Sequence, residues 1–376
     1  MAGIYIHIPF CRQKCHYCNF FSLASVKSRD AFVPRLLEEI EARKDYLNQE
    51  KVSTIYFGGG TPSLLPVDEI RRVLDALFAT FKIDPHAEIT LEANPDDLHP
   101  DYLQQLKHSL VNRLSIGIQS FRDADLKYLN RVHSAREAKQ ALQMAQDAGF
   151  DNMTIDLIYG IPTLGDKDWA YNLDVFFESG IRHLSAYALT VEPKTALHVL
   201  IAKGKMKAVD ERQSAAQFEM LMQRMEQSGY VHYEISNFAL PGHYSKHNSL
   251  YWLGGHYLGL GPSAHSFNGL ERQWNVSNLS AYLHQQDIST RIAEKEVLSM
   301  EQRYNEYVMT SLRTVWGCDL LHIRNVFGDA WADYARKQSQ KYLQNGKITL
   351  RDNRLFLTTS GKLYADGIAA DLFADE

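Results

Sequence analysis

Residues 3–187 repeat one pattern: a short β-branched or aromatic run, a polar or glycine-rich turn, and an amphipathic segment of helical length. The strands are predicted at residues 3–8, 53–57, 88–92, 113–118, 152–157 and 182–187. The intervening helices are predicted near residues 30–48, 67–81, 100–110, 135–148 and 167–179. Strands that alternate with helices in this way form right-handed βαβ units around a parallel sheet. Six units are fewer than the eight of a closed barrel, so the pattern predicts an α/β fold, a partial TIM-like (β/α)6 barrel.

The second half of the chain has a different character. A helix near 208–228 and a strand at 231–235 precede a glycine- and histidine-rich stretch at 237–270, and helical periodicity returns from residue 297. Two short strands then flank a turn at Asp352 and Asn353. Helices followed by a hairpin predict a small winged-helix-like α+β domain. The expected organisation is therefore a core at 1–236, a connecting segment at 237–296 and a C-terminal domain at 297–376.

Charge and hydropathy narrow the classes of partner. The net charge is −5, and residues 297–376 carry ten basic and ten acidic residues. Because phosphate contacts need a basic face, neither the wing nor the whole chain is expected to bind nucleic acid. No apolar run approaches the roughly 18 residues of a membrane span, and no signal peptide precedes the first strand. The chain is expected to be cytoplasmic.

Three of the four cysteines, Cys11, Cys15 and Cys18, follow the first strand with the spacing C-x3-C-x2-C. Thiolates hold iron–sulfur clusters, and three of them leave one iron of a four-iron cube without a protein ligand. The amino and carboxylate groups of a methionine can bind such an open iron. Two alternatives remain at this point: three buried structural thiols, or a zinc site completed by His7 or His16.

Each further strand ends in residues that suit a bound cofactor. The second runs into the glycines of residues 58–62, which allow a ligand to approach the backbone closely. Glu92, Gln119 and Asp156 lie at the ends of later strands, and Arg131 follows a short helix at 123–129. Singly, each has an ordinary alternative as a hydrogen-bonded strand end or a surface arginine. Together they outline one mouth at the carboxyl end of the barrel.

The motifs YIHIPFC-x3-C-x2-C, GGGTP, SIGIQSF, LNRVH and DLIYGIP stand in this order along the chain. With them the sequence resembles, over nearly its whole length, the oxygen-independent coproporphyrinogen oxidase-like branch of the radical-SAM proteins. The resemblance implies a 4Fe–4S cluster on the three cysteines and bound S-adenosylmethionine (SAM). The positions that match the SAM-contacting positions of the family are Tyr5, Tyr17, Gly59, Gly60, Thr61, Glu92, Gln119, Arg131 and Asp156.

Within this branch the residues favour the haem-chaperone subfamily. The oxidases usually carry a fourth cysteine two residues after the third, where this chain has Phe20, and an N-terminal extension, whereas here the strand is expected almost at the start. Residues 247–252 read HNSLYW and match the His-Asn-x-x-Tyr-Trp motif of the chaperones. The resemblance then implies haem b as a further cofactor and His247 as its ligand. His243, His256 and His265 are alternative ligands.

Cys318 is expected to be a small buried hydrophobe, with thiolate ligation of haem iron as its alternative. The resemblance implies transfer of haem to membrane respiratory proteins, during which the protein would be peripheral at the inner membrane face. The cluster and SAM would govern transfer or homodimerisation. The main alternative is an enzyme, a radical-SAM oxidoreductase of the coproporphyrinogen III dehydrogenase type. A radical-SAM enzyme acting on RNA lacks the basic stripe that it would need.

Overall fold

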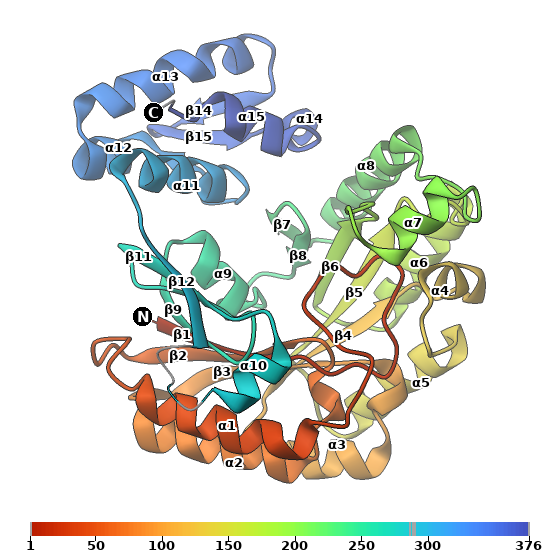
Figure 1. Ribbon diagram of the computed structural model, residues 1–376. Helices are drawn as coiled ribbons and strands as arrows, with labels where there is room; N and C mark the ends of the chain where they lie inside the picture. Colours follow the sequence, from red (N-terminus) through yellow and green to blue (C-terminus); the bar gives the residue numbers. More distant parts are fainter. Residues whose placement is uncertain (1, 286, 288–290, 375–376) are drawn as a thin grey trace.

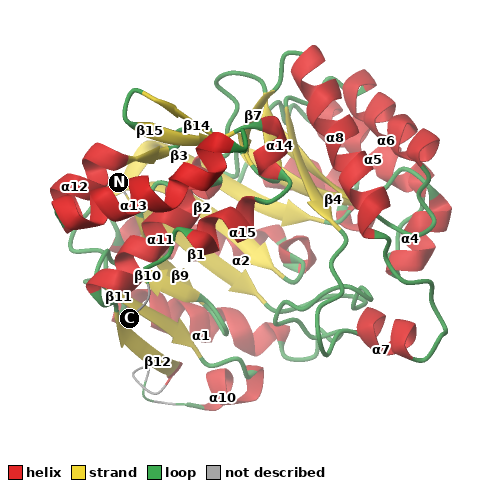
Figure 2. Ribbon diagram, turned by 90° about the horizontal axis from the view of Figure 1, so that it is seen from above, coloured by secondary structure: helices red, strands yellow, loops and turns green. Residues whose placement is uncertain are grey.

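A computed structural model describes residues 2–285, 287 and 291–374. Six parallel strands lie side by side in their sequence order and form the centre of one curved sheet (Figures 1 and 2). They are β1 (Ala2–Ile8), β2 (Val52–Gly59), β3 (Ile83–Ala93), β4 (Arg113–Gln119), β5 (Met153–Tyr159) and β6 (His183–Ala188). Most residues of these strands are buried, which accounts for their nearly continuous apolar runs. The predicted partial barrel is confirmed.

Helices cover the outer face of this sheet, while its inner face is turned toward the loop that follows β1 (Figure 1). The helices of this part are α1 (Arg29–Ala42), α2 (Val67–Thr80), α3 (Pro100–Lys107), α4 (Asp123–Leu129), α5 (Ala135–Asp147), α6 (Asp166–Glu178), α7 (Ala196–Ala202) and α8 (Glu211–Gln227). Two short 3-10 turns are η1 (Pro62–Leu64) and η2 (Pro95–Asp97). The first helix ends six residues before its predicted end at residue 48. At the predicted end, Asn48 and Gln49 have φ values of 51° and 62°, so a right-handed helix cannot continue through them.

The segment at 237–296 does more than connect two domains. Together with β7, which precedes it, the segment extends the sheet at both edges. Beyond β6 lie β8 (Asn237–Ala239) and β7 (Val231–Glu234), both antiparallel to their neighbours. Beyond β1 lie β9 (His256–Leu260), which runs parallel to β1, and then β10 (His265–Phe267), β11 (Glu271–Asn275) and β12 (Ile292–Val297). Helices α9 (Lys246–Trp252) and α10 (Leu279–His284) interrupt them. These strands are short and glycine-interrupted, so their local pattern gives little signal.

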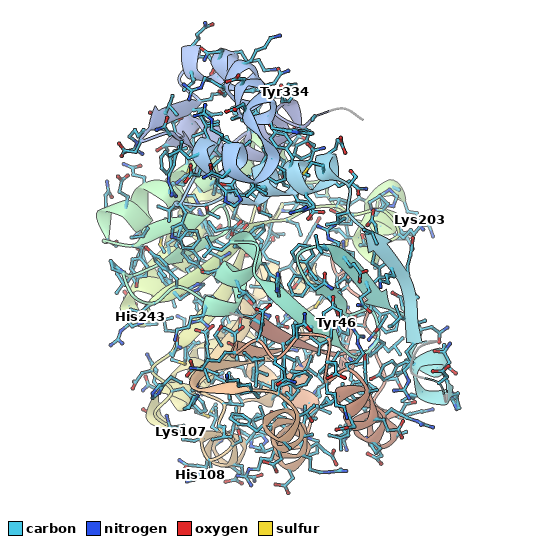
Figure 3. All side chains as sticks on the ribbon, turned by 90° about the vertical axis from the view of Figure 1, so that its left-hand side faces the viewer. Tyr46, Lys107, His108, Lys203, His243 and Tyr334 are labelled. Carbon is cyan, nitrogen blue, oxygen red and sulfur yellow. The ribbon has the colours of Figure 1, made fainter. Side chains whose placement is uncertain are left out.

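The C-terminal domain has its own hydrophobic core. Its elements are α11 (Met300–Leu312), β13 (Cys318–Asp319), α12 (Leu320–Phe327), α13 (Asp329–Gln344), β14 (Ile348–Arg351), β15 (Arg354–Leu357), α14 (Thr359–Lys362) and α15 (Ala365–Asp371). The three strands form an antiparallel sheet in the order β13-β15-β14. The hairpin turns through Asp352 and Asn353, both with positive φ. This arrangement confirms the winged-helix-like domain. In Figure 3, Tyr334 marks this domain and Lys107 marks the opposite end of the molecule.

Arg313, just after α11, joins the two parts of the chain. Its guanidinium forms an ion pair with buried Glu234 of β7 at 3.2 Å, and it also pairs with Asp366 of α15. The same guanidinium lies 5.3 Å from the ring centroid of Trp252, the last residue of α9. Since α9 carries the His-Asn-x-x-Tyr-Trp motif, the motif is part of the contact between barrel and C-terminal domain. No helix among the described residues has both the length and the apolar character needed to cross a bilayer.

Candidate functional site

The carboxyl ends of the parallel strands surround a cleft of about 410 Å³, which we call the cluster cleft. It brings together nearly all of the residues that the sequence predicts for the site. Those that line it are Cys11, Tyr17, Cys15, Cys18, Gly59, Gly60, Thr61, Glu92, Gln119, Arg131 and Asp156. These residues come from the ends of the four strands β2 to β5, from the loop after β1 and, for Arg131, from the turn after α4. The strand order of the barrel therefore assembles most of them.

The three cysteines lie on a loop that is closed at its base. The amide of Cys11 donates to the Leu23 carbonyl at 3.0 Å, and the amide of Leu23 donates to the Pro9 carbonyl at 2.8 Å. Within the loop, the amide of Cys18 donates to the Cys15 carbonyl at 3.3 Å. These bonds hold residues 11–23 as one unit, so the three thiols face the cleft together.

Polar groups from other strands reach the sulfur atoms. Thr61 donates its hydroxyl to Cys11 Sγ at 3.5 Å, and Arg131 donates Nη1–H to Cys15 Sγ at 3.4 Å. Ser22 Oγ lies 4.0 Å from Cys18 Sγ. Burial raises the pKa of the Cys11 and Cys18 thiols, so a metal that binds here has to displace their protons. Hydrogen bonds to ligating sulfur stabilise its negative charge and tune a bound cluster.

The donor set fits a four-iron cluster better than a single ion. Among the described residues, no three His, Cys, Asp or Glu side chains converge on one metal position. His7 Nε2 bonds the Phe21 carbonyl at 2.8 Å, and His16 Nδ1 bonds the Tyr128 carbonyl at 3.1 Å. Neither histidine lines the cluster cleft, so neither completes a zinc site there. Three thiols spread around one cleft are the ligands that a cube with one open iron requires.

The glycine motif is required by close packing against the cysteine loop. Gly59 has a φ of 107°, a conformation that L side chains rarely adopt. A Cβ atom at Gly60 would lie 2.6 Å from the Phe10 carbonyl oxygen and 3.1 Å from Cys11 Sγ. A Cβ atom at Gly59 would instead lie 2.7 Å from the His7 ring. The backbone can therefore approach β1 and the cysteine loop only because neither residue has a side chain. The amide of Gly59 also donates to Glu92 Oε2 at 3.2 Å.

Two half-buried carboxyl groups, Glu92 and Asp156, face the cluster cleft from β3 and β5. Burial is the main cause of a raised pKa of about 7 for Glu92. Neighbouring Asp156 also raises this pKa, and hydrogen bonds from Tyr56 and Gly59 lower it. Burial likewise raises the pKa of Asp156 to about 6, against the lowering effects of a hydrogen bond with Ser185 and of nearby arginines. At neutral pH these groups are close to their titration points. A cationic ligand would therefore favour their ionised forms.

Arg131 forms hydrogen bonds to several walls of the cluster cleft. Its Nη2 donates to Asn94 Oδ1 at 2.6 Å and to the Gly117 carbonyl at 2.7 Å, in addition to its bond to Cys15. Asn94 in turn donates Nδ2–H to Thr61 Oγ1 at 3.2 Å. Arg131 is thus neither a solvated surface arginine nor an isolated cation. It positions the cysteine loop against the ends of β3 and β4.

Tyr5 is the one predicted SAM-contacting residue that lies outside the cluster cleft. A Cβ atom at Gly58 would come within 2.9 Å of the Tyr5 ring, and the Tyr5 hydroxyl bonds His7 Nδ1 at 3.1 Å. Conversely, the cleft is also lined by residues that the sequence reasoning missed, among them Ser115, Gly117, Tyr187 and Thr190. Ser115 and Gly117 alternate with Gln119 along β4, and a period of two places them on one face.

His247 of the His-Asn-x-x-Tyr-Trp motif is buried beneath the cluster cleft and does not line it. The His247 Nδ1 atom bonds Thr54 Oγ1 at 2.8 Å, and its Nε2 atom bonds the Tyr251 hydroxyl at 2.8 Å. Its ring stacks on Tyr56 with 5.0 Å between centroids. Burial lowers the pKa of His247 to about 3, so the imidazole is neutral. With both nitrogens engaged, neither can bind iron in this conformation.

The alternative haem ligands are dispersed. His243 lies half-buried at the edge of the molecule (Figure 3), His256 bonds Glu50, and His265 stacks on Trp274 at 5.6 Å. Cys318 is fully buried in the C-terminal core, and burial raises its pKa to about 12. It is therefore the small buried hydrophobe that the sequence predicts.

Comparison with known proteins agrees with this architecture. The pattern of the radical SAM superfamily matches residues 5–175, and that of the HemN C-terminal domain matches residues 298–364. "Heme chaperone HemW" of Mycobacterium tuberculosis H37Rv is 34% identical over 98% of this chain and 94% of its own length. The protein of the same name from Bacillus subtilis 168 is 32% identical over 98% of both. The solved structure of coproporphyrinogen III oxidase (HemN) from Escherichia coli superposes with a TM-score of 0.85, at 24% identity, over 99% of this chain and 90% of that chain.

Proposed function

The chain belongs to the family of the heme chaperone HemW, and we propose that it binds haem and hands it to proteins that need it. The observation that carries the proposal is the similarity to named haem chaperones over nearly the full length of both chains. The residues agree with this reading. Phe20, 65% exposed, occupies the position at which the oxidases of this branch usually have a fourth cysteine.

We propose that the cluster cleft holds a 4Fe–4S cluster and SAM. Cys11, Cys15 and Cys18 would ligate three irons, and the remaining iron would accept the amino and carboxylate groups of SAM. Glu92 and Asp156 would face its positive charge from β3 and β5. Haem b is the cargo that the family membership supports. The acceptors we propose are membrane respiratory proteins, approached from the cytoplasmic side. Self-association controlled by the cluster and SAM is a further part of this proposal, which sedimentation with and without SAM would test.

Ligation of haem by His247 stays a prediction, and it requires one local rearrangement. Ligation through Nε2 requires the Tyr251 hydroxyl to give up its bond to that nitrogen. Tyr251→Phe removes this competitor and keeps the ring. If His247 ligates the iron, Tyr251→Phe should retain or strengthen haem binding, while His247→Ala should weaken it and shift the Soret band.

The proposal is tested by titrating the anaerobically reconstituted protein with haem. A haem chaperone should give a Soret band that saturates at a defined stoichiometry and should pass haem to an acceptor without its own turnover. Absence of saturable binding would contradict the proposal.

The second candidate is an oxidoreductase of the coproporphyrinogen III dehydrogenase type. It is favoured by one observation: the cluster cleft contains all but one of the predicted SAM-contacting residues. Incubation with coproporphyrinogen III, SAM and a reductant separates the two candidates. We expect no protoporphyrinogen, and sustained product formation would establish the enzyme instead.

A further inference from the structure

The chain that follows α11 is paired with the barrel along its backbone. The amide of Ile235 donates to the Arg313 carbonyl at 3.1 Å, and the amide of Val315 donates to the Tyr233 carbonyl at 2.9 Å. Trp316 then lies edge-on to the Tyr233 ring, with 6.3 Å between the centroids. Figure 1 shows α11, from which this stretch continues, above α9. The side chain of Arg313 therefore starts from a fixed stretch of backbone and not from a flexible linker.

The guanidinium of Arg313 is held by a carboxylate that is itself fixed. Glu234 Oε1 accepts from Arg313 Nε at 3.3 Å and forms an ion pair with Nη2 at 3.2 Å. The other oxygen of Glu234, Oε2, accepts from the Ser236 amide at 2.9 Å and from Asn237 Nδ2–H at 2.6 Å. The Glu234 side chain is 1% exposed. Because the donors of arginine form a rigid planar fork, two of them on one buried oxygen fix the orientation of the guanidinium.

Trp252 contacts this guanidinium with its ring. The Cζ atom of Arg313 lies 5.3 Å from the Trp252 ring centroid, a distance at which a cation is attracted to an aromatic face. Trp252 is half-buried, and among the described residues its indole forms no hydrogen bond and stacks on no other aromatic ring. Within this part of the chain, Arg313 is therefore the one directional contact of the indole.

The two ends of α9 are held by different parts of the chain. At its start, the amides of Lys246 and His247 donate to Glu88 of β3. At its end, Trp252 contacts Arg313, which follows the first helix of the C-terminal domain. A helix of seven residues has too few internal hydrogen bonds to fix its own last turn. The orientation of Trp252 therefore depends on a residue of the C-terminal domain, whereas His247 is held by the barrel.

We propose that Arg313 is a positioning residue for haem and that it acts through Trp252. The inference rests on the proposed function and on haem binding by the motif of α9. One face of the indole contacts the guanidinium, and the other would be presented to the macrocycle, whose flat π-system suits an aromatic partner. Asp366 of α15 also pairs with Arg313. Docking of the C-terminal domain on the barrel would therefore complete the haem site.

Haem titration of the reconstituted full chain tests this role with Arg313→Gln and a matched control. The control is Arg224 of α8, which pairs with Asp174 at 2.6 Å and lies 5.2 Å from the Phe177 ring centroid. We expect the dissociation constant for haem to rise about tenfold in Arg313→Gln and less than about twofold in Arg224→Gln. Arg313→Lys keeps a cation beside the indole, so its dissociation constant should stay within about threefold of the unmodified value.

A double variant separates positioning from stability. Arg313→Gln leaves Glu234 buried without its counter-charge, which by itself destabilises a fold. Glu234→Gln combined with Arg313→Gln removes both charges, so Tm should return toward that of the unmodified protein. The dissociation constant for haem should nevertheless stay raised by about tenfold. Haem affinity that recovers together with Tm would overturn the inference, because the role of Arg313 would then be structural alone.

The dependence on Trp252 is tested by Trp252→Leu. This change should raise the dissociation constant about tenfold and alter the Soret band, and adding Arg313→Gln should raise it by less than a further factor of about two. A second loss of about tenfold in the Trp252→Leu background, or unchanged affinity in either single variant, would overturn the inference. Failure of the unmodified protein to bind haem would instead remove the proposed function. Iron content and SAM binding are measured for every variant, so that loss of the fold is recognised.

Discussion

The ring of Tyr56 stacks on His247 at 5.0 Å, and its hydroxyl donates to Glu92 at 2.8 Å on the other side. The side chain of Tyr56 therefore lies between His247 of the haem-chaperone motif and Glu92, a carboxylate of the cluster cleft. Glu88 adds a second link, because its Oε1 atom accepts hydrogen bonds from the amides of Lys246 and His247 at the start of α9. The motif therefore contacts the barrel interior through Tyr56 of β2 and through Glu88 of β3.

Tyr56→Phe tests this arrangement by removing the hydroxyl while keeping the stacked ring. The hydrogen bond to Glu92 is lost, so SAM affinity should fall about tenfold, the effect of one bond to a charged group. Haem affinity should stay unchanged, since the ring still supports His247. Calorimetric titration with SAM and a Soret titration measure the two effects.

Tyr5→Phe is the matched control for this pair. Tyr5 lies outside the cluster cleft, and among the described residues its hydroxyl bonds His7 alone. We expect its SAM affinity to match the unmodified protein. A loss equal to that in Tyr56→Phe would mean that Tyr5 contacts SAM, as the family resemblance implies.

Each of Cys11, Cys15 and Cys18 should be indispensable for the cluster. Alanine at any one of them leaves too few thiolates, so anaerobic reconstitution should give little iron and sulfide and no visible absorption of a 4Fe–4S cluster. Cys318→Ala is the control. It should keep full cluster content and lose about 1 kcal/mol of unfolding free energy, as expected for a small change in a buried core. Full cluster content in any one of the three loop variants would refute the ligand assignment.

Thr61→Val should change the reduction potential of the cluster without removing it. The valine cannot donate to Cys11 Sγ, and loss of a bond worth about 1 kcal/mol lowers a one-electron potential by roughly 40 mV. Thr90→Val is the comparison, because Thr90 is also buried on a neighbouring strand and its hydroxyl has no partner among the described residues. Redox titration followed by electron paramagnetic resonance should show a shift in the first variant alone.

SAM binding should weaken as the pH falls from 8 to 5. The pKa of Glu92 is about 7 and that of Asp156 is about 6, so both carboxylates become protonated over this interval and lose their attraction for the positively charged ligand. Affinity should drop by up to about tenfold per pH unit below the pKa of Glu92. Calorimetry at several pH values with Glu92→Gln as the comparison tests the cause. The variant should bind more weakly at pH 8 and show a flatter profile, and an unaltered pH dependence would exclude Glu92 as its origin.

The sequence by itself determined the parallel core and the convergence of most of the predicted site residues on the cluster cleft. Strand and helix periods are local, and the carboxyl ends of adjacent parallel strands must meet at one edge, so Cys11, Gly59, Glu92 and Asp156 had to converge. Tertiary structure alone decided what depends on contacts between distant segments. The pairing of β9 with β1, the burial of His247 between Thr54 and Tyr251, and the ion pair of Arg313 with Glu234 all arise from nonlocal packing. The neighbours of a side chain set its burial and its pKa. Many of these neighbours are distant in the sequence, and a local sequence pattern does not show which distant residues will meet.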